Sequence, residues 1–125
     1  MFTIGKTFKF NSAHFLPGHK KCGKVHGHTY HLTVEISADL VRSTGMVLDL
    51  HLLSQIVNSV IKPLDHDCIN EILPEMLNPT CENLAEFLQQ RIYKKVSKLL
   101  LRPLRGITVR VKIQEGDGGY AIYES

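Results

Sequence analysis

Polar and apolar residues alternate in four stretches of the chain, and such alternation is typical of β-strands. The first stretch covers residues 2–14 and the second covers residues 26–40. A third stretch runs from 107 to 115, and a short fourth stretch from 120 to 123 follows a glycine-rich turn. Successive side chains of a strand point to opposite faces, so each stretch predicts one apolar face and one polar face.

Two intervening segments carry apolar residues at the spacing of an α-helix. We expect the first helix to begin after Asp49, which can cap it, and to be disrupted in its last turn by Pro63. The second is expected to start with Thr80 as cap and Glu82 in its first turn, and to end before Pro103. Its apolar stripe consists of Leu84, Leu88, Ile92, Val96 and Leu99.

The elements follow one another in the order ββααββ, which indicates the α+β class. We expect one domain spanning residues 1–125, built as a four-stranded antiparallel sheet with two helices on one of its faces. The other face carries mostly polar or small residues and stays uncovered. The unpaired edges of such a sheet favour association with further chains.

Composition narrows the class of protein. With 125 residues, 43% of them hydrophobic and 22% charged, the chain has the make-up of an ordinary soluble globular protein. It has no apolar run long enough to cross a membrane, and its first residues lack a secretory apolar segment. Its three cysteines show no paired spacing, so we expect a cytosolic protein with free thiols. A net charge of +3 without an aromatic and basic stripe does not indicate nucleic-acid binding.

Three histidines occupy the apolar phase near the ends of the first two strands. His14 closes the first strand, and His26 and His28 open the second. A single histidine on an apolar face is usually a packed core residue, but antiparallel pairing brings these three imidazoles to one corner. Burying them without partners is costly, whereas one zinc ion satisfies all three and keeps an open position when the site is catalytic. We therefore predict a zinc site. Strand phase says nothing about His19 in the intervening loop, which stays open as a further ligand.

The thiol of Cys22, shortly before His26, allows two interpretations. It can be a fourth ligand that closes a structural site, or a base or nucleophile beside an open site. Lysines at positions 20, 21 and 24 surround it, and neighbouring cations favour the thiolate form. Spacing alone leaves both interpretations open.

Two further groups of residues are candidates for chemistry. Asp65 and His66 form a carboxylate-imidazole pair, the usual companion of an activated nucleophile, and Asp67 competes with Asp65 for orienting the ring.

Glu115 stands in the apolar phase at the end of the third predicted strand. It either faces water because the strand has ended, or is a buried carboxylate that binds paired N–H donors of a ligand.

Together these residues resemble the 6-pyruvoyltetrahydropterin synthase family, whose tunnelling fold has the same ββααββ order. The matching pieces run along almost the whole chain: His14, Cys22 with His26-Gly27-His28, Gly45-Met46-Val47-Leu48-Asp49, Leu64-Asp65-His66, Pro79-Thr80-Cys81-Glu82-Asn83 and Glu115. The short gap between Cys22 and His26 looks most like the bacterial 6-carboxytetrahydropterin synthases of the queuosine pathway. Animal-type pyruvoyl enzymes typically have a longer gap there.

The resemblance implies a zinc-dependent lyase that converts 7,8-dihydroneopterin triphosphate to 6-carboxy-5,6,7,8-tetrahydropterin, acetaldehyde and triphosphate. It also implies a role for each matching site residue: zinc ligands at His14, His26 and His28, a base at Cys22, a relay at His66 with Asp65, and a pterin anchor at Glu115. The family forms trimers, paired as hexamers, with active sites between subunits. In such a homo-oligomer the unpaired edges of the sheet would pair with those of neighbouring subunits.

Two other functions stay open at this point. A pyruvoyl-forming lyase would eliminate triphosphate from the same substrate, and the motifs separate it only weakly from the carboxy-forming enzyme. A non-catalytic, zinc-stabilised pterin-binding protein would use Cys22 as a metal ligand instead. Loss of the Cys22 thiol separates the lyases from the non-catalytic protein: a lyase would keep its zinc, whereas the non-catalytic protein would lose it.

Overall fold

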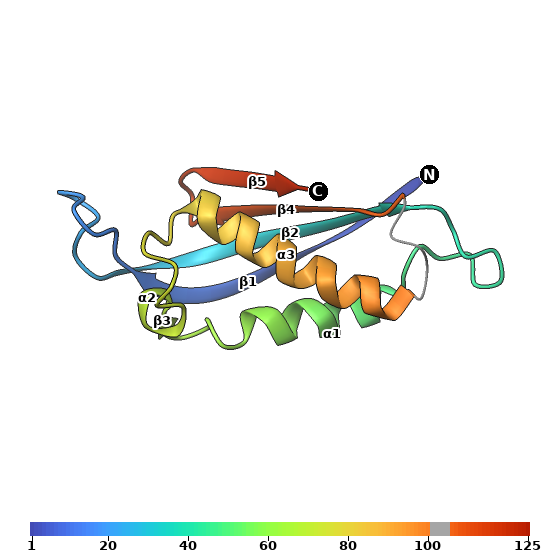
Figure 1. Ribbon diagram of the computed structural model, residues 1–125, viewed down its shortest axis with the longest axis horizontal. Helices are drawn as coiled ribbons and strands as arrows, with labels where there is room; N and C mark the ends of the chain where they lie inside the picture. The colour runs from blue at the N-terminus through green and yellow to red at the C-terminus, as the bar shows by residue number, and fades with distance from the viewer. Residues whose placement is uncertain (101–105) are drawn as a thin grey trace.

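A five-stranded sheet with strand order β3-β1-β2-β4-β5 forms the framework of the computed structural model, which describes residues 1–100 and 106–125. Four of its strands are β1 (Phe2–His14), β2 (His26–Ala38), β4 (Thr108–Glu115) and β5 (Tyr120–Glu124). Each is antiparallel to its neighbours among these four (Figure 1). The alternation of polar and apolar residues thus predicted all four strands in the right order.

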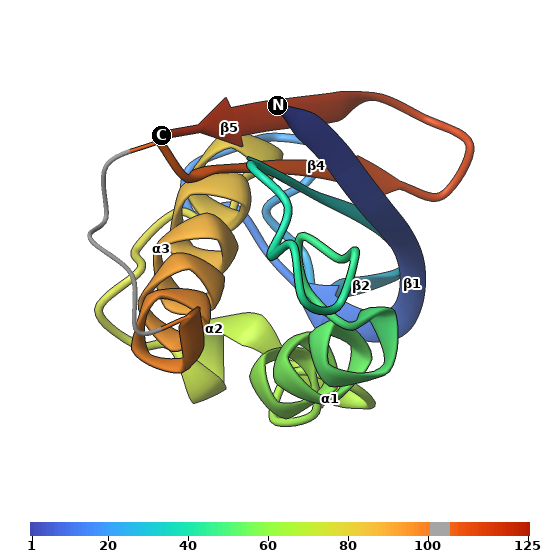
Figure 2. The same ribbon diagram turned by 90° about the vertical axis from the view of Figure 1, so that its right-hand side faces the viewer.

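Two long helices cover one face of the sheet, as the ββααββ order predicted. They are α1 (Leu50–Ile61) and α3 (Cys81–Leu100), and the sheet curves around both of them (Figure 2). Between the layers lies one core of buried apolar side chains, to which β2 contributes Leu32, Val34 and Ile36 at every second position. This packing places the first turn of α3 beside the ends of β1 and β4.

The connection after α1 differs from the expectation of a polar loop. Its residues form β3 (Asp67–Cys68), which pairs parallel with Ser12 and Ala13 of β1, and then the single turn α2 (Ile69–Ile72). The sheet is therefore mixed and five-stranded, instead of antiparallel and four-stranded. A strand of two residues has no periodicity to read, and its pairing depends on tertiary contacts such as the 2.8 Å bond that Ser12 Oγ donates to the Asp67 carbonyl.

Both predicted helix caps are present. Asp49 Oδ1 accepts from the His51 backbone N–H at 2.8 Å, and Thr80 Oγ1 accepts from the Asn83 N–H at 3.2 Å. The apolar stripe of α3 is buried as predicted, except that Leu99 is 46% exposed. Leu100 packs against the core instead, because it lies four residues after the preceding buried position. The predicted stop at Pro103 lies outside the described residues.

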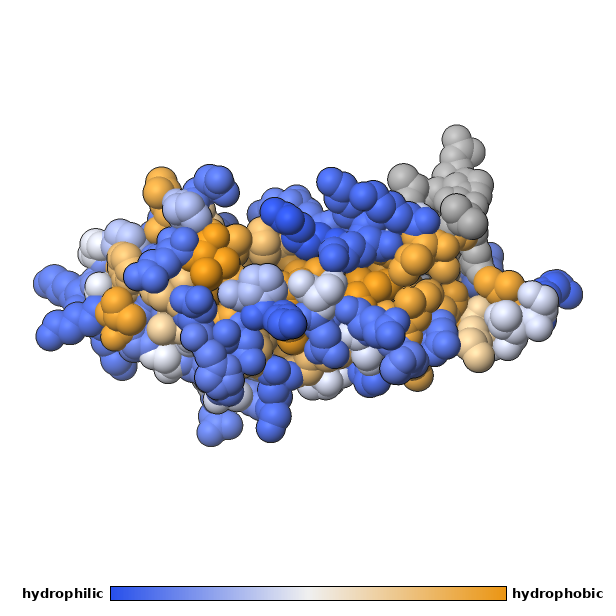
Figure 3. All heavy atoms as spheres, turned by 90° about the horizontal axis from the view of Figure 1, so that it is seen from below, coloured by the Kyte–Doolittle hydropathy of each residue, from blue (hydrophilic) through white to orange (hydrophobic). Residues whose placement is uncertain are grey.

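The uncovered face and the edges of the sheet remain accessible in the single chain. The far edge of β1 is paired only where β3 adjoins it, and β5 has no outer neighbour within the described ranges. Hydrophilic side chains dominate the side on which α1 lies, with apolar areas showing between them (Figure 3). No helix in the described part of the chain has the length and the apolar character needed to cross a bilayer.

Candidate metal centre and active site

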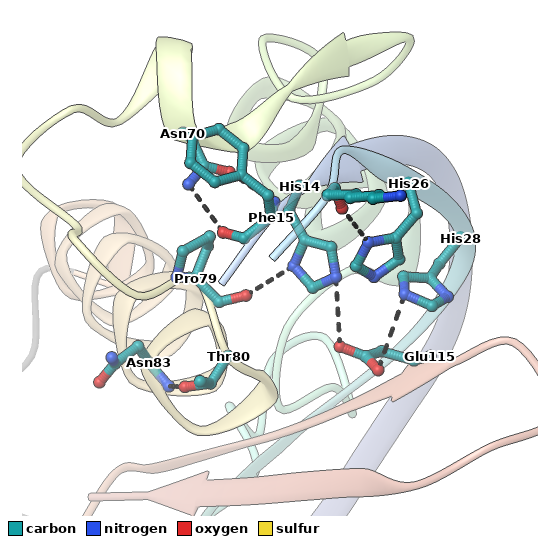
Figure 4. Close-up of polar contacts among 10 residues, drawn as sticks. His14, Phe15, His26, His28, Asn70, Pro79, Thr80, Asn83 and Glu115 are labelled. Carbon is teal, nitrogen blue, oxygen red and sulfur yellow. Dashed lines mark hydrogen bonds and ion pairs between the residues drawn. The ribbon is translucent and has the colours of Figure 1, made fainter. Parts of the chain in front are cut away.

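Three imidazoles converge where β1 ends and β2 begins. The antiparallel register sets His14 directly opposite His26, and His28 follows two residues later on the same face. The ring centroids lie 4.7 Å apart for His14 and His26, 5.0 Å for His14 and His28, and 4.8 Å for His26 and His28 (Figure 4). One nitrogen from each ring lies within 4.8 Å of the other two, close enough for a shared cation. The predicted convergence is thus present.

Hydrogen bonds to backbone carbonyls orient two of the rings. His14 Nδ1 donates to the Pro79 carbonyl at 2.8 Å, and His26 Nδ1 donates to the Lys24 carbonyl at 2.7 Å. A carbonyl only accepts, so each Nδ1 carries the proton and each Nε2 keeps its lone pair. Metal-binding histidines usually show this arrangement, because the outer bond holds the ring and makes the ligand nitrogen more basic.

The cluster has the properties of a metal site. His14 is 1% exposed, and burial lowers the pKa of its imidazole, which keeps the ring neutral and able to act as a ligand. The Nε2 atom of His28 is buried and has no hydrogen-bond partner among the described residues. An unsatisfied buried nitrogen is costly, and a divalent cation would satisfy it. The three imidazoles therefore fit a cation with nitrogen ligands.

Glu115 faces the histidines, although its phase alone also allowed a solvent-facing position. Its Oε1 atom lies 3.8 Å from His14 Nε2 and its Oε2 atom 3.9 Å from His28 Nε2 (Figure 4). Its side chain is 28% exposed, so the carboxylate is partly shielded from water. It also borders a cavity of about 300 Å³. That cavity is lined by Leu16, Thr80, Cys81, Glu82, Glu115, Gly119 and Tyr120.

The start of α3 contributes to this cavity, which the sequence pattern did not show. Thr80 and Glu82 were expected only as helix-start residues, yet both line the cavity next to Cys81. Burial raises the pKa of the Cys81 thiol to about 12, and the neighbouring Glu115 carboxylate adds to this rise. The thiol is therefore protonated at neutral pH and is not a nucleophile. Its match to the family motif was the only signal in the sequence that pointed to it.

Asp65 and His66 form a fixed pair. Asp65 Oδ2 lies 3.0 Å from His66 Nδ1, and the backbone N–H of Asn11 donates to Asp65 Oδ1 at 2.9 Å. This bond from Asn11, helped by His66, lowers the pKa of the Asp65 carboxyl. Asp67 instead accepts from the N–H of Cys68 at 2.8 Å. The structure therefore decides between the two candidates, and Asp65 is the carboxylate that orients His66.

His66 borders a hollow that also reaches the histidine cluster. A cavity of about 610 Å³ includes both His66 and His28 in its wall. The His66 side chain is 77% exposed, which leaves its Nε2 atom accessible to a bound molecule. One member of each group, His28 of the histidine cluster and His66 of the pair, thus lines the same hollow.

Cys22 lies apart from the other predicted site residues. It belongs to the loop between β1 and β2, which protrudes beyond the end of the sheet (Figure 1). Within the described part of the chain, its thiol makes no hydrogen bond to His66 and is not among the converging ligand atoms. His19 is also outside that cluster. In a single chain, therefore, neither residue closes the metal site, and Cys22 does not meet the Asp65–His66 pair.

The Tyr30 hydroxyl gives a first testable prediction. Tyr30 is fully buried beneath the histidine rings, and its hydroxyl has no hydrogen-bond partner among the described residues. An unsatisfied buried hydroxyl costs about 1–3 kcal/mol, so Tyr30→Phe is expected to raise the free energy of unfolding by about 1 kcal/mol. Denaturant unfolding of the metal-free protein measures this, with Tyr123→Phe as a control on a partly exposed ring. A loss of stability in Tyr30→Phe would show that the hydroxyl has a partner.

These features define an α+β protein of the tunnelling-fold type with a cluster of three histidines that can hold a metal ion. The family model for 6-pyruvoyl tetrahydropterin synthase matches residues 3–125. The chain belongs to this family. The family description and the names of the relatives identify it as an enzyme, a lyase of this type. The fold agrees with a solved structure, the 6-pyruvoyl tetrahydropterin synthase of Caenorhabditis elegans, with a TM-score of 0.80 and 22% identity over 99% of this chain and 95% of that one.

Curated relatives carry more specific names. An Archaeoglobus fulgidus protein with the provisional name 6-carboxy-5,6,7,8-tetrahydropterin synthase is 40% identical over 94% of this chain and 91% of its own. The 6-carboxy-5,6,7,8-tetrahydropterin synthase of Haemophilus influenzae is 52% identical over 53% of this chain and 50% of its own. A dihydroneopterin monophosphate aldolase of Pyrococcus furiosus is 37% identical over 58% of this chain and 60% of its own. Related chains thus carry out more than one pterin reaction.

Proposed function

We propose that this protein is a zinc-dependent lyase that converts 7,8-dihydroneopterin triphosphate to 6-carboxy-5,6,7,8-tetrahydropterin, acetaldehyde and triphosphate. The main support is the position of Glu115, which borders both the three-histidine cluster and a cavity. One substrate can therefore be held by its ring at the carboxylate while its side chain reaches the metal. The names of the most similar relatives favour the carboxy-forming reaction. We place the reaction in queuosine biosynthesis in the cytosol, in keeping with three free thiols.

Zinc is the proposed ion because a site of three imidazole ligands suits it. His14, His26 and His28 would hold it through their Nε2 atoms, two of which have lone pairs set free by the carbonyl bonds at Nδ1. When bound, the ion supplies Lewis acidity that polarises the oxygens of the substrate side chain. The residues around it then supply binding and proton transfer.

Each remaining site residue has a role in this proposal. Glu115 accepts from the ring N–H and the 2-amino group of the pterin, a pair of charge-assisted hydrogen bonds. Cys22, as thiolate, removes a proton from the carbon next to a polarised oxygen. His66 donates from Nδ1 to Asp65, which leaves its Nε2 atom to accept and return protons.

The proposed site is completed between subunits. Cys22 and the Asp65–His66 pair do not meet within one chain, although the proposed reaction needs both. The free edges of β1 and β5 support association of copies edge to edge, which would close the sheets into a barrel. We therefore propose a homo-oligomer, a trimer or a pair of trimers, in which one subunit provides Cys22 and another provides His66.

Mixing two inactive variants tests this sharing of the site. Cys22→Ala and His66→Ala subunits, unfolded together and reassembled, are expected to regain part of the activity, because some sites combine two intact halves. Each variant reassembled alone is the control. Hybrid oligomers that are verified by mass spectrometry but stay inactive would contradict a shared site.

The product assay tests the function itself. The zinc-loaded protein is incubated with 7,8-dihydroneopterin triphosphate, and acetaldehyde, triphosphate and the pterin are measured. Equal amounts of acetaldehyde and triphosphate are expected. Triphosphate without acetaldehyde would favour the pyruvoyl-forming reaction, and turnover of dihydroneopterin monophosphate alone would favour the aldolase named for one relative. Pterin binding without any product would mean that the protein is not an enzyme.

Glu115→Gln tests the pterin anchor. The amide keeps the shape of the carboxylate but loses its charge and half of its acceptor capacity. Charge-assisted hydrogen bonds contribute about 1.5–3 kcal/mol, so the Kd for a non-reacting pterin is expected to rise about 10- to 100-fold. Fluorescence quenching measures the Kd, and the zinc content should not change. Asp117→Asn, an exposed charge change in the next turn, is the control. An unchanged Kd in Glu115→Gln would refute the anchoring role.

A further inference from the structure

The loop between β1 and β2 holds a histidine that the proposed reaction does not use. We propose that His19 is a positioning residue, which fixes Cys22 by accepting a hydrogen bond from the Cys22 backbone. This inference rests on the proposed function, because it concerns the residue assigned there as the base. Three hydrogen bonds within the loop and one close backbone contact support it.

Both backbone polar groups of Cys22 are bound within the loop. The Cys22 N–H donates to His19 Nδ1 at 2.9 Å, and the Cys22 carbonyl accepts from the Leu16 N–H at 2.7 Å. The Leu16 carbonyl accepts from the His19 N–H at 3.1 Å, which closes the turn. The imidazole therefore occupies the place that a backbone carbonyl would take in an ordinary turn. By binding the Cys22 N–H, the ring fixes the position of the backbone to which the thiol is attached.

The residue after Cys22 reinforces this arrangement. A Cβ atom on Gly23 would stand 2.4 Å from the His19 carbonyl oxygen, closer than real side chains approach a backbone atom. Gly23 therefore permits the chain to pass directly against His19. The His19 ring thus binds the Cys22 N–H, and the chain passes close to the His19 backbone at the next residue.

Hydrogen bonds to the rest of the fold hold the two ends of the loop, from Asn70 to Phe15 and from His26 to the Lys24 carbonyl, so the bonds within the loop fix the stretch between them. The three lysines around Cys22 are exposed, and the loop protrudes from the sheet (Figure 1). His19 is free for this role because it lies outside the metal cluster. A neutral ring that accepts at Nδ1 carries its proton on Nε2, so the bond also sets the tautomer. A displacement of a catalytic group by about 1 Å can lower a rate about 100-fold, so a loose loop would be costly.

A pair of variants separates the hydrogen bond from the bulk of the ring. His19→Leu removes the acceptor, whereas His19→Asn places Oδ1 close to the position of Nδ1. We expect His19→Leu to lower kcat up to about 100-fold with little change in KM, and His19→Asn to restore kcat to within about threefold of the native value. Gly23→Ala should lower kcat as well, because it displaces the His19 backbone. His51→Asn, a change at an exposed histidine on α1, is the control.

A second measurement does not depend on turnover. Hydrogen exchange of the peptide covering residues 16–25 should show protection of the Cys22 amide in the native protein and in His19→Asn, and its loss in His19→Leu. If the native protein turns no substrate over, the proposed reaction fails, while the exchange comparison still tests the positioning bond. Equal loss of kcat in both His19 variants would overturn the role, as would full protection in His19→Leu. A drop in zinc content or melting temperature in His19→Leu would also overturn it, because His19 would then be structural.

Discussion

His28→Ala is expected to abolish metal binding and, with it, turnover. The variant removes one of three imidazoles whose ligand atoms lie within 4.8 Å of one another. Loss of an outer-shell partner alone weakens metal binding about 10- to 100-fold, so loss of a ligand should exceed that range. Metal content after dialysis and a competition titration with a chelator measure the affinity. His31→Ala, on the polar side of the same strand, is the matched control.

The fold of His28→Ala should survive the loss of the metal. His28 lies at the start of β2 with its side chain 26% exposed, and its Nε2 atom, 3.9 Å from Glu115 Oε2, has no hydrogen-bond partner among the described residues. Its removal therefore relieves an unsatisfied group and leaves the apolar core untouched. Circular dichroism and the melting temperature of the metal-free protein check this. Undiminished zinc in His28→Ala would contradict the three-histidine site.

Cys22→Ala is expected to keep zinc and fold but to lower kcat by about 10²–10⁴-fold, the usual range for a lost general base. The thiol lies in a protruding loop outside the converging ligand atoms, so we expect neither the metal nor the core to depend on it. Single-turnover kinetics with saturating substrate, together with zinc analysis, separate the two effects. Cys68→Ala, which removes a thiol with only a weak bond to Asn70, is the control.

The same variant decides between the catalytic and the structural interpretations of Cys22. If Cys22 were a fourth ligand, its loss would release zinc and lower the melting temperature. That outcome would favour a zinc-stabilised, non-catalytic protein and would contradict the lyase. The protonated Cys81 thiol does not offer a substitute base, because its pKa near 12 keeps it neutral at physiological pH.

Much of the fold could be read from the chain because the relevant signals are local. Alternation over residues 26–38 repeats every two positions, and the structure buries every second side chain from Tyr30 to Ala38. The cap at Asp49 depends on residues within one helical turn and is present as predicted. The short β3 could not be read in this way, since its two residues pair only because the fold brings them beside the end of β1.

The convergence of the three histidines could also be predicted from the sequence, since it follows from two simple rules. Residues at i and i+2 share a strand face, which pairs His26 with His28, and antiparallel pairing across a loop adds His14. The choice between Asp65 and Asp67 was beyond these rules. It depends on the Asn11 backbone, which is distant in sequence and reaches only one of the two carboxylates.

The sequence by itself determined the order of the strands, the two long helices and the convergence of three imidazoles, because periodicity and pairing act over short distances along the chain. Only the tertiary structure decided that Glu115 faces the histidines and meets Cys81, which lies on another element. It also decided that Cys22 stands apart from His66 within one chain. Contacts between distant segments are selected by packing and register, and no local pattern of residues records them.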